Sequence, residues 1–216
     1  EMYKNNYSST NRTSQTATSG LYGSNYYILT SEFKVYLCIN NGSDPENPKG
    51  KTSKFEPTHT STTVPAADNT ATGDGYQWKY LYTIAPADIV KFVTTAYIPL
   101  PEKWGDVATK SIKDAAVDGK LETIVIKRRG TATVDGVDGD ISGIPIIGDG
   151  TGGTATVKVT NGVVSEIKLS NTNSSGYTYA YVRFVNGTWG GKKLVVGTLT
   201  DEPQFEVIIP PKGGHG

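Results

Sequence analysis

The fold is decided by the stretch Gly73-Asp-Gly-Tyr-Gln-Trp-Lys-Tyr-Leu-Tyr-Thr-Ile84. It opens with an Asp-Gly pair, which is typical of a turn, and then alternates between two sets of side chains. We expect one face to carry Tyr76, Trp78, Tyr80, Tyr82 and Ile84, and the other to carry Gln77, Lys79 and Thr83, with Leu81 as its only apolar residue. This period-two pattern predicts a half-buried β-strand. No acidic or basic side chain lies on the aromatic face, which therefore predicts core packing rather than chemistry.

The rest of the chain reads as strands joined by turns, because Gly (25 residues) and Pro (11 residues) are frequent and Thr, Ser and Asn are abundant. Strands are predicted at 26–30, 33–39, 121–127, 144–147, 154–160, 163–169, 177–185, 193–196 and 204–209. Short helices are predicted at 86–92, with Pro86 in first position, and at 106–117, capped by Asp106 and ended by Gly119. The predicted fold class is mainly β, with antiparallel β-sandwich-like sheets and one or two short peripheral helices.

The sequence divides into three parts. Residues 1–24 form an extended polar N-terminal segment, residues 25–118 a β domain with a long irregular loop (43–74) and short helices, and residues 119–216 a Gly-rich β hairpin-repeat domain. Both polar segments hold too few apolar residues to become ordered on the chain's own core. We expect them to lie against a second copy or a neighbouring subunit, to bury well over about 1,000 Å² in total, and to be cleaved readily in the free protein.

The register of the hairpin around Asn161-Gly162 depends on the length of its loop. A three-residue loop over 160–162 pairs Val159 with Val163 and places the odd-numbered apolar residues of both strands on one face. Because a shift of one residue turns every side chain to the other face, we predict this loop and not a two-residue loop.

Composition argues against several classes of partner. Lys plus Arg (21) equals Asp plus Glu (21), so the formal net charge is zero, whereas nucleic-acid binders normally carry a basic excess. The cluster at 127–129 is expected to be a solvated strand edge. No apolar run is long enough to cross a membrane. The single cysteine, Cys38, excludes an internal disulfide and is expected to be buried in a strand.

The candidate chemical groups do not form a recognisable site. His59 and His215 have no nucleophile nearby in sequence, and no catalytic, cofactor-binding or metal-binding residue is predicted. The carboxylates of Asp135, Asp138 and Asp140, with Asp149 further on, lack the full calcium-loop pattern and fit Asp-Gly turns. Whether Asp135, Asp138 and Asp140 bind a cation is left open.

Three sequence runs, 74–84, 88–92 and 97–101, resemble the baseplate wedge subunit (gene product eight family) of contractile-tailed bacteriophages. They read Asp-Gly-Tyr-x-Trp-Lys-Tyr-Leu-Tyr-x-Ile, Asp-Ile-Val-Lys-Phe and Tyr-Ile-Pro-Leu-Pro. The motif residues are Asp74, Gly75, Tyr76, Trp78, Tyr80, Tyr82 and Pro99. Gly-rich runs at 148–156, 161–164, 175–178 and 211–216 resemble a marine, cyanophage-like branch of the same family.

The resemblance implies a structural virion protein with no enzymatic activity and no cofactor. Such a subunit is made in the host cytoplasm, lies in the tail baseplate and assembles with other baseplate proteins, as a homodimer within each wedge. Nucleic acid and membranes are not expected partners. Because the chain begins at Glu1 and not at Met, we expect it to be a fragment.

The alternative is a glycan-binding β-sandwich module of a virion or secreted protein. It requires Trp78 or Trp189 to lie exposed in a groove. If Trp78 is instead a core residue, Trp78→Ala should cost about 3–5 kcal/mol.

Overall fold

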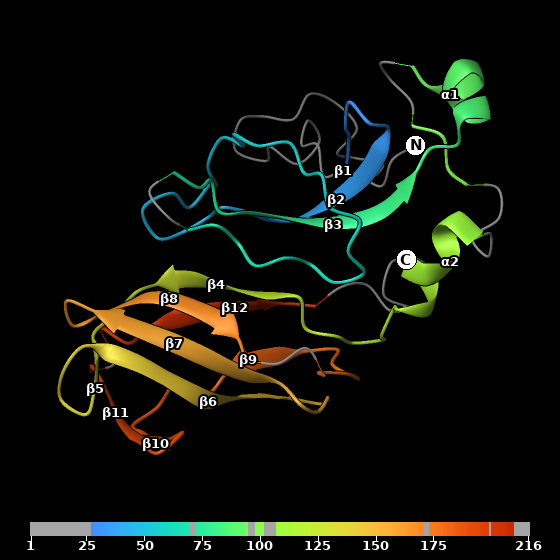
Figure 1. Ribbon diagram of the computed structural model, residues 1–216. Coiled ribbons are helices and arrows are strands. Elements are labelled where there is room, and N and C mark those ends of the chain that lie inside the picture. Colours follow the sequence, from blue (N-terminus) through green and yellow to red (C-terminus); the bar gives the residue numbers. More distant parts are fainter. Residues whose placement is uncertain are drawn as a thin grey trace, which may run out of the picture.

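The computed structural model describes residues 27–69, 72–94, 98–101, 107–170, 173–198 and 200–209. The first part of the chain forms an antiparallel sheet in the order β1-β2-β3. Its strands are β1 (Tyr27–Leu29), β2 (Lys34–Asn41) and β3 (Tyr76–Thr83), and the helices α1 (Pro86–Phe92) and α2 (Val107–Asp114) follow. Figure 1 shows this sheet lying over the strands of the second part, with α1 at its outer end.

The second part consists of short antiparallel strands around one apolar core. The strands are β4 (Thr123–Arg128), β5 (Ala132–Val134), β6 (Gly139–Gly148), β7 (Thr154–Thr160), β8 (Val163–Leu169), β9 (Ala180–Val182), β10 (Gly187–Trp189), β11 (Lys192–Val196) and β12 (Gln204–Ile208). Their sheets have the orders β8-β7-β6-β9, β10-β11-β5 and β12-β4. The predicted fold class is confirmed: the chain is mainly β, its sheets are antiparallel, and two short helices are described.

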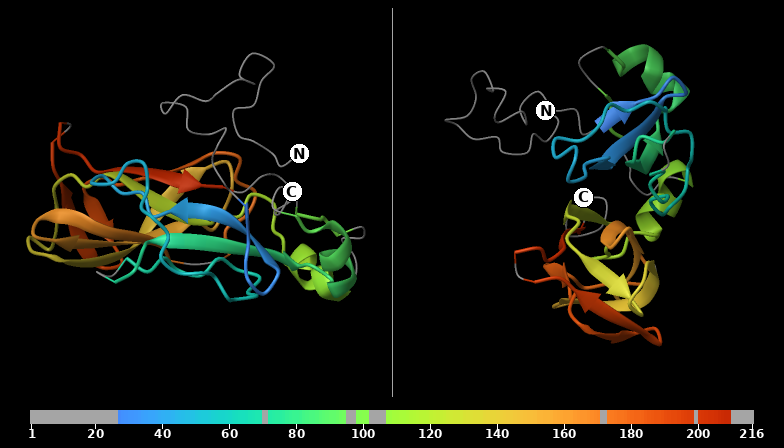
Figure 2. Two further views of the ribbon diagram at one scale, coloured as in Figure 1. Left: turned by 90° about the horizontal axis from the view of Figure 1, so that it is seen from above. Right: turned by 90° about the vertical axis from the view of Figure 1, so that its left-hand side faces the viewer.

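The right-hand view of Figure 2 shows the two parts one above the other, whereas they overlap in the view from above. The second part holds the larger core, in which Ile144, Val157 and Leu194 are fully buried. The first part has two smaller clusters, one on each face of its sheet, around Tyr36 and Tyr82.

Strand positions were predictable where alternation is long. The predictions 154–160 and 163–169 coincide with β7 and β8, whereas the strand predicted at 177–185 is reduced to β9. The three-residue strands β5 and β10 were missed, because they exist through their pairing with β11 rather than through a pattern of their own.

Helix α1 begins at Pro86 as predicted. Helix α2 ends at Asp114, three residues before the predicted end, and Asp106 lies outside the described residues. Gly119 has the predicted left-handed backbone, with φ +63°. Its position is also crowded, because an added Cβ would lie 2.2 Å from the backbone nitrogen of Tyr177.

The predicted register of the Asn161-Gly162 hairpin is wrong. Val159 pairs with Val164, so the loop has two residues, and both have positive φ (+55° and +72°), as a type I′ turn requires. A register shift beyond Val159 then restores the expected facing of the apolar residues, with Val157 opposite Ile167. The apolar residues do share one face, but a bulge in β8 achieves this without a longer loop.

The single aromatic face predicted for β3 is also wrong. Val35 pairs with Tyr82 while Tyr36 pairs with Tyr80, so Leu81 is an extra residue in β3. Consecutive residues of β2 point to opposite faces, and Tyr80 and Tyr82 therefore do so as well. Tyr80 packs with Tyr36 and the α2 residue Ile112, whereas Tyr82 packs with Val35, Leu81 and Ile84.

Candidate interaction surface

The first two motif residues attach the 43–74 loop to the start of β3. The Asp74 carboxylate accepts hydrogen bonds from the backbone N–H groups of Lys54 (2.7 Å) and Tyr76 (3.0 Å). Burial raises the pKa of Asp74, but these hydrogen bonds outweigh it and hold that pKa below its ordinary value. Gly75 follows with φ +73°, and its Cβ position would lie 3.1 Å from Gly42 Cα. The Asp-Gly pair thus lies directly before β3, and Asp74 anchors the loop to it.

The loop is held further by aromatic residues of the sheet. The Tyr36 hydroxyl donates to the carbonyl of His59 (2.6 Å), and His59 Nε2 lies 3.0 Å from the carbonyl of Trp78. The Tyr76 hydroxyl donates to the carbonyl of Lys51 (2.8 Å). These contacts within the chain were not anticipated from the sequence, and they give His59 a structural position. His215 and residues 1–24 lie outside the described residues.

The other aromatic motif residues divide between core and edge. Tyr80 and Tyr82 are buried, and the Tyr82 hydroxyl donates to the carbonyl of Pro99 (2.9 Å), which joins two separate parts of the motif. Trp78 is partly buried, and its ring stacks on Tyr76 at 5.3 Å.

Neither tryptophan singled out for glycan binding has the exposed ring that this role needs. Trp78 and Trp189 are both partly buried. Their indole Nε1 atoms are inaccessible and lack a hydrogen-bond partner among the described residues. A stacking platform presents the ring face and the N–H to the sugar, so these positions do not favour the glycan-binding alternative.

Four polar side chains connect the two parts of the chain, and we call them the joint: Gln77, Lys79, Glu122 and Thr123. The Lys79 ammonium forms an ion pair with the Glu122 carboxylate, and the two side chains are only 8% and 4% exposed. Beside them, the Thr123 hydroxyl donates to Gln77 Oε1 (2.6 Å), while Gln77 Nε2 donates to the carbonyl of Pro65 (3.0 Å). The polar face of β3, which in a half-buried strand normally faces solvent, is therefore buried against the start of β4.

A second ion pair supports the same connection at the surface. Arg129 binds the Glu46 carboxylate through two hydrogen bonds of 2.7 and 2.8 Å and also donates to the carbonyls of Val164 and Ser165. The hydrogen bonds from Arg129 hold the pKa of Glu46 below its ordinary value. The basic cluster at 127–129 is thus a solvated edge only in part, because Arg129 ties the 43–74 loop to β8.

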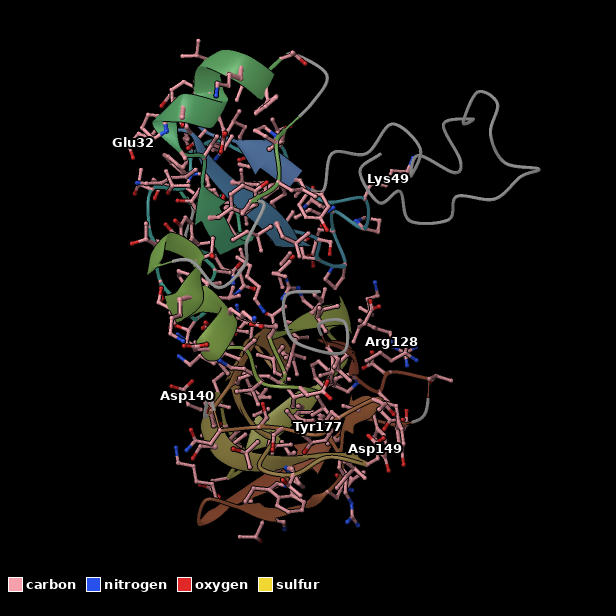
Figure 3. All side chains as sticks on the ribbon, turned by 90° about the vertical axis from the view of Figure 1, so that its right-hand side faces the viewer. Glu32, Lys49, Arg128, Asp140, Asp149 and Tyr177 are labelled. Atoms are coloured by element: carbon pink, nitrogen blue, oxygen red, sulfur yellow. The ribbon has the colours of Figure 1, made fainter. Side chains whose placement is uncertain are left out.

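Two of the three candidate cation ligands, Asp135 and Asp138, accept backbone hydrogen bonds. Both Asp138 oxygens accept the turn N–H groups of Asn161 (2.6 Å) and Gly162 (2.9 Å), and Asp135 accepts the N–H of Lys193 (2.8 Å). Asp149 and Asp140 lie apart on the second part of the chain (Figure 3). Within the described ranges, no three His, Cys, Asp or Glu side chains are grouped as a metal site would require.

Asp149 predicts a specific pH dependence. The Thr178 hydroxyl (2.5 Å) and backbone N–H (2.8 Å) donate to its carboxylate and lower its pKa from 3.8 to about 2. Because the folded-state pKa is depressed, the stabilisation is complete above pH 3.8 and is lost as the pH falls towards 2. Asp149→Asn should therefore flatten the dependence of the thermal midpoint on pH between 4 and 2.

The control for this experiment is Asp140→Asn, whose exposed carboxylate makes no hydrogen bond among the described residues. It should leave the dependence of the thermal midpoint on pH between 4 and 2 unchanged. If the thermal midpoints of wild type and Asp149→Asn fell equally between pH 4 and 2, the Thr178 contacts would not hold the carboxylate in its charged form.

Apolar side chains are exposed around α1, and we call Val90, Phe92 and Leu100 the apolar tip. They are 90%, 56% and 71% exposed, and α1 buries none of its residues. Behind them, Ile89, Val93 and other apolar residues pack on the Tyr82 cluster, so the tip stands on an ordered base. Large exposed apolar side chains on one segment of a folded chain are typical of protein–protein interfaces.

The sequence was compared with models of protein families. Residues 29–135 match the family model Phage-Gp8, described as "Bacteriophage T4, Gp8". This region is a Gp8-family sequence. The matched range contains the Gp8 motif residues, the joint and the apolar tip, whereas β6 to β12 lie beyond it. The family predicted from the motif is confirmed, but the marine branch is not.

Two further comparisons, with curated proteins and with solved structures, found no match. No helix among the described residues combines the length and apolar character needed to cross a membrane. The Gp8-family match over residues 29–135 indicates a structural component of the phage baseplate.

Proposed function

We propose that the chain is a structural subunit of the tail baseplate wedge of a contractile-tailed phage. It is made in the host cytoplasm, becomes part of the virion, forms a homodimer within each wedge and binds other baseplate proteins without catalysing a reaction. The observation that carries this proposal is the Gp8-family match over residues 29–135. The motif residues, from Asp74 to Pro99, serve in this proposal to build the sheet that supports the interface.

The physical features of the matched region support an assembly role. The joint and the Arg129–Glu46 pair connect the sheet to the second part of the chain. Such a connection suits a structural subunit that holds neighbouring baseplate proteins in fixed positions. Helix α1, which carries two of the three tip residues, lies at the outer end of the sheet, where a neighbouring subunit can cover it. The net charge of zero suits contacts with proteins better than contacts with nucleic acid.

We also propose that the chain comprises two domains, 25–118 and 119–216, preceded by the polar segment 1–24. The two apolar clusters on the β1–β3 sheet and the separate core of β4 to β12 support this division.

Removal of the apolar tip tests the proposed assembly. The double variant Val90→Asp/Phe92→Asp should fold with an unchanged thermal midpoint, because both side chains are exposed. Incorporation into particles, measured by mass spectrometry in a complementation assay, should fall at least ~10-fold, since central apolar contacts dominate interface energies.

The matched control is Val137→Asp, in a turn of the second part, where the exposed valine is 64% accessible. It adds one negative charge, against two in the double variant, at an exposed apolar position outside the tip, and it should be incorporated normally. Normal incorporation of the double variant would show that the tip is not an assembly surface.

A further inference from the structure

A groove runs along β8 between the two parts of the chain. It consists of two adjoining cavities of about 260 and 140 Å³, whose linings share residues of both parts, among them Asn40, Ile124 and Ile167. One wall is β8, and the opposite wall of the larger cavity includes the loop residues Val64, Ala66 and Ala67. We call this feature the β8 groove.

The β8 wall presents an unpaired strand edge. β8 is the outer strand of the sheet β8-β7-β6-β9; within the described residues it pairs along its length with β7, and at its first residue, Val163, it forms an isolated bridge to Thr131. The Ser170 N–H donates to the carbonyl of Thr154. In an antiparallel pair every second residue bonds to the neighbouring strand, so Lys168 and Glu166 also bond to β7. The N–H and C=O groups of Ile167 and Leu169 therefore point away from β7.

Strand β4 packs beside β8, but no described residue forms a backbone hydrogen bond to the β8 edge at Ile167 and Leu169. Their backbone groups make no hydrogen bond to another described residue, whereas further along the edge Arg129 binds the carbonyls of Val164 and Ser165. An unpaired edge is a template for another strand, which would satisfy these groups by main-chain hydrogen bonds.

The groove offers little net charge to a ligand. Glu122 is paired with Lys79, Lys51 with Asp44, and Arg129 with Glu46. The other charged side chains along the cavities are of mixed sign: Lys120, Glu166 and Lys168. The opposite wall carries small uncharged side chains, which allow a backbone to approach closely. Each cavity is also smaller than the ~300–1,000 Å³ usual for sites that enclose small molecules.

We propose that the β8 groove binds an extended, uncharged segment of a neighbouring baseplate protein, which adds to β8 as a strand. The backbone groups of Ile167 and Leu169 pair with the segment, and the 64–67 wall covers its other side. This inference rests on the proposed function and adds a second contact, separate from the apolar tip, together with the kind of partner that it fits.

Amide exchange at single residues tests the inference with a control inside the same strand. In the free protein the amides of Ile167 and Leu169 should exchange rapidly, while that of Lys168, which is bonded to β7, should be protected. In purified tail particles we expect protection of Ile167 and Leu169 to increase at least ~100-fold, with Lys168 protected in both samples.

Two variants address the walls separately. Leu169→Pro removes the outward N–H, whereas the control Leu169→Val retains it, so only the proline variant should reduce incorporation, by ~10-fold. Ala66→Trp fills the groove from the exposed loop and should have a similar effect, while Thr188→Trp on β10, outside both the groove and the apolar tip, should not. Thermal midpoints of the free variants establish that each one is folded.

The outcomes distinguish this inference from the proposed function. Particles that lack the chain would contradict the proposed function itself. Particles that contain it with unprotected Ile167 and Leu169 amides would overturn the groove inference alone. Cross-links from Lys168 to a second copy of this chain would overturn the assignment of the segment to a neighbouring protein.

Discussion

Replacement of Lys79 by Met is expected to destabilise the chain by about 3–5 kcal/mol, because it leaves the Glu122 carboxylate buried without its partner. The ion pair is nearly inaccessible, so water cannot replace the lost ammonium group. Urea denaturation of the two proteins measures the difference, as a lower midpoint at unchanged slope.

The double variant Lys79→Met/Glu122→Leu separates the cost of an unpaired charge from the contribution of the pair. We expect it to recover most of the loss, or to exceed wild-type stability by ~1–4 kcal/mol, because apolar side chains avoid the desolvation cost of both charges. A loss below ~1 kcal/mol for Lys79→Met alone is the result typical of a surface pair and would contradict a buried joint.

Tyr36→Ala is expected to cost about 3–5 kcal/mol, as a large-to-small change at a fully buried aromatic residue. Tyr36 packs edge-on against Tyr80 at 5.6 Å and against His59 at 5.4 Å, and its hydroxyl holds the His59 carbonyl. Its loss should therefore also make residues 51–59 more sensitive to protease, which limited proteolysis with mass spectrometry detects.

The control Tyr36→Phe keeps the ring and removes only the hydroxyl. It should cost ~1 kcal/mol, the usual contribution of one hydrogen bond, and should increase cleavage only at the loop. If Tyr36→Ala were no more damaging than Tyr36→Phe, the ring would not be a core element of the sheet.

The motif strand shows how far alternation can predict a sheet. The sequence placed β3 within one residue, since eight residues of strong strand formers leave few alternatives. It did not predict the extra residue at Leu81, because a bulge is a property of a strand pair, and β2 determines where it falls. The exchange of faces between Tyr80 and Tyr82 follows from that single residue.

The joint illustrates a second limit. Gln77 and Lys79 occupy the polar positions of an alternating strand, which normally face solvent. Their partners Thr123 and Glu122 lie more than 40 residues away in the chain, so no local pattern links them. The available signal was weak: a Lys within a strand, and a Glu immediately before a later one.

The hairpin shows two valid rules in apparent conflict. Asn161-Gly162 is the strongest local signal for a two-residue turn, whereas the odd-numbered apolar pattern favoured a longer loop. The chain satisfies both by inserting a bulge near Ser165, so that Val164 and Ile167 still face the core. The Asn-Gly pair and the apolar pattern are therefore compatible, and the Asn-Gly pair was the better predictor of the loop length.

The location of this chain in purified virions tests the central claim most directly. A reconstruction of the tail at side-chain resolution should place the β1–β3 sheet and the β4–β12 part within the baseplate, with Val90, Phe92 and Leu100 covered by a neighbouring subunit. Infectious particles whose baseplate density is fully assigned to other proteins, and in which mass spectrometry does not find this chain, would contradict the account.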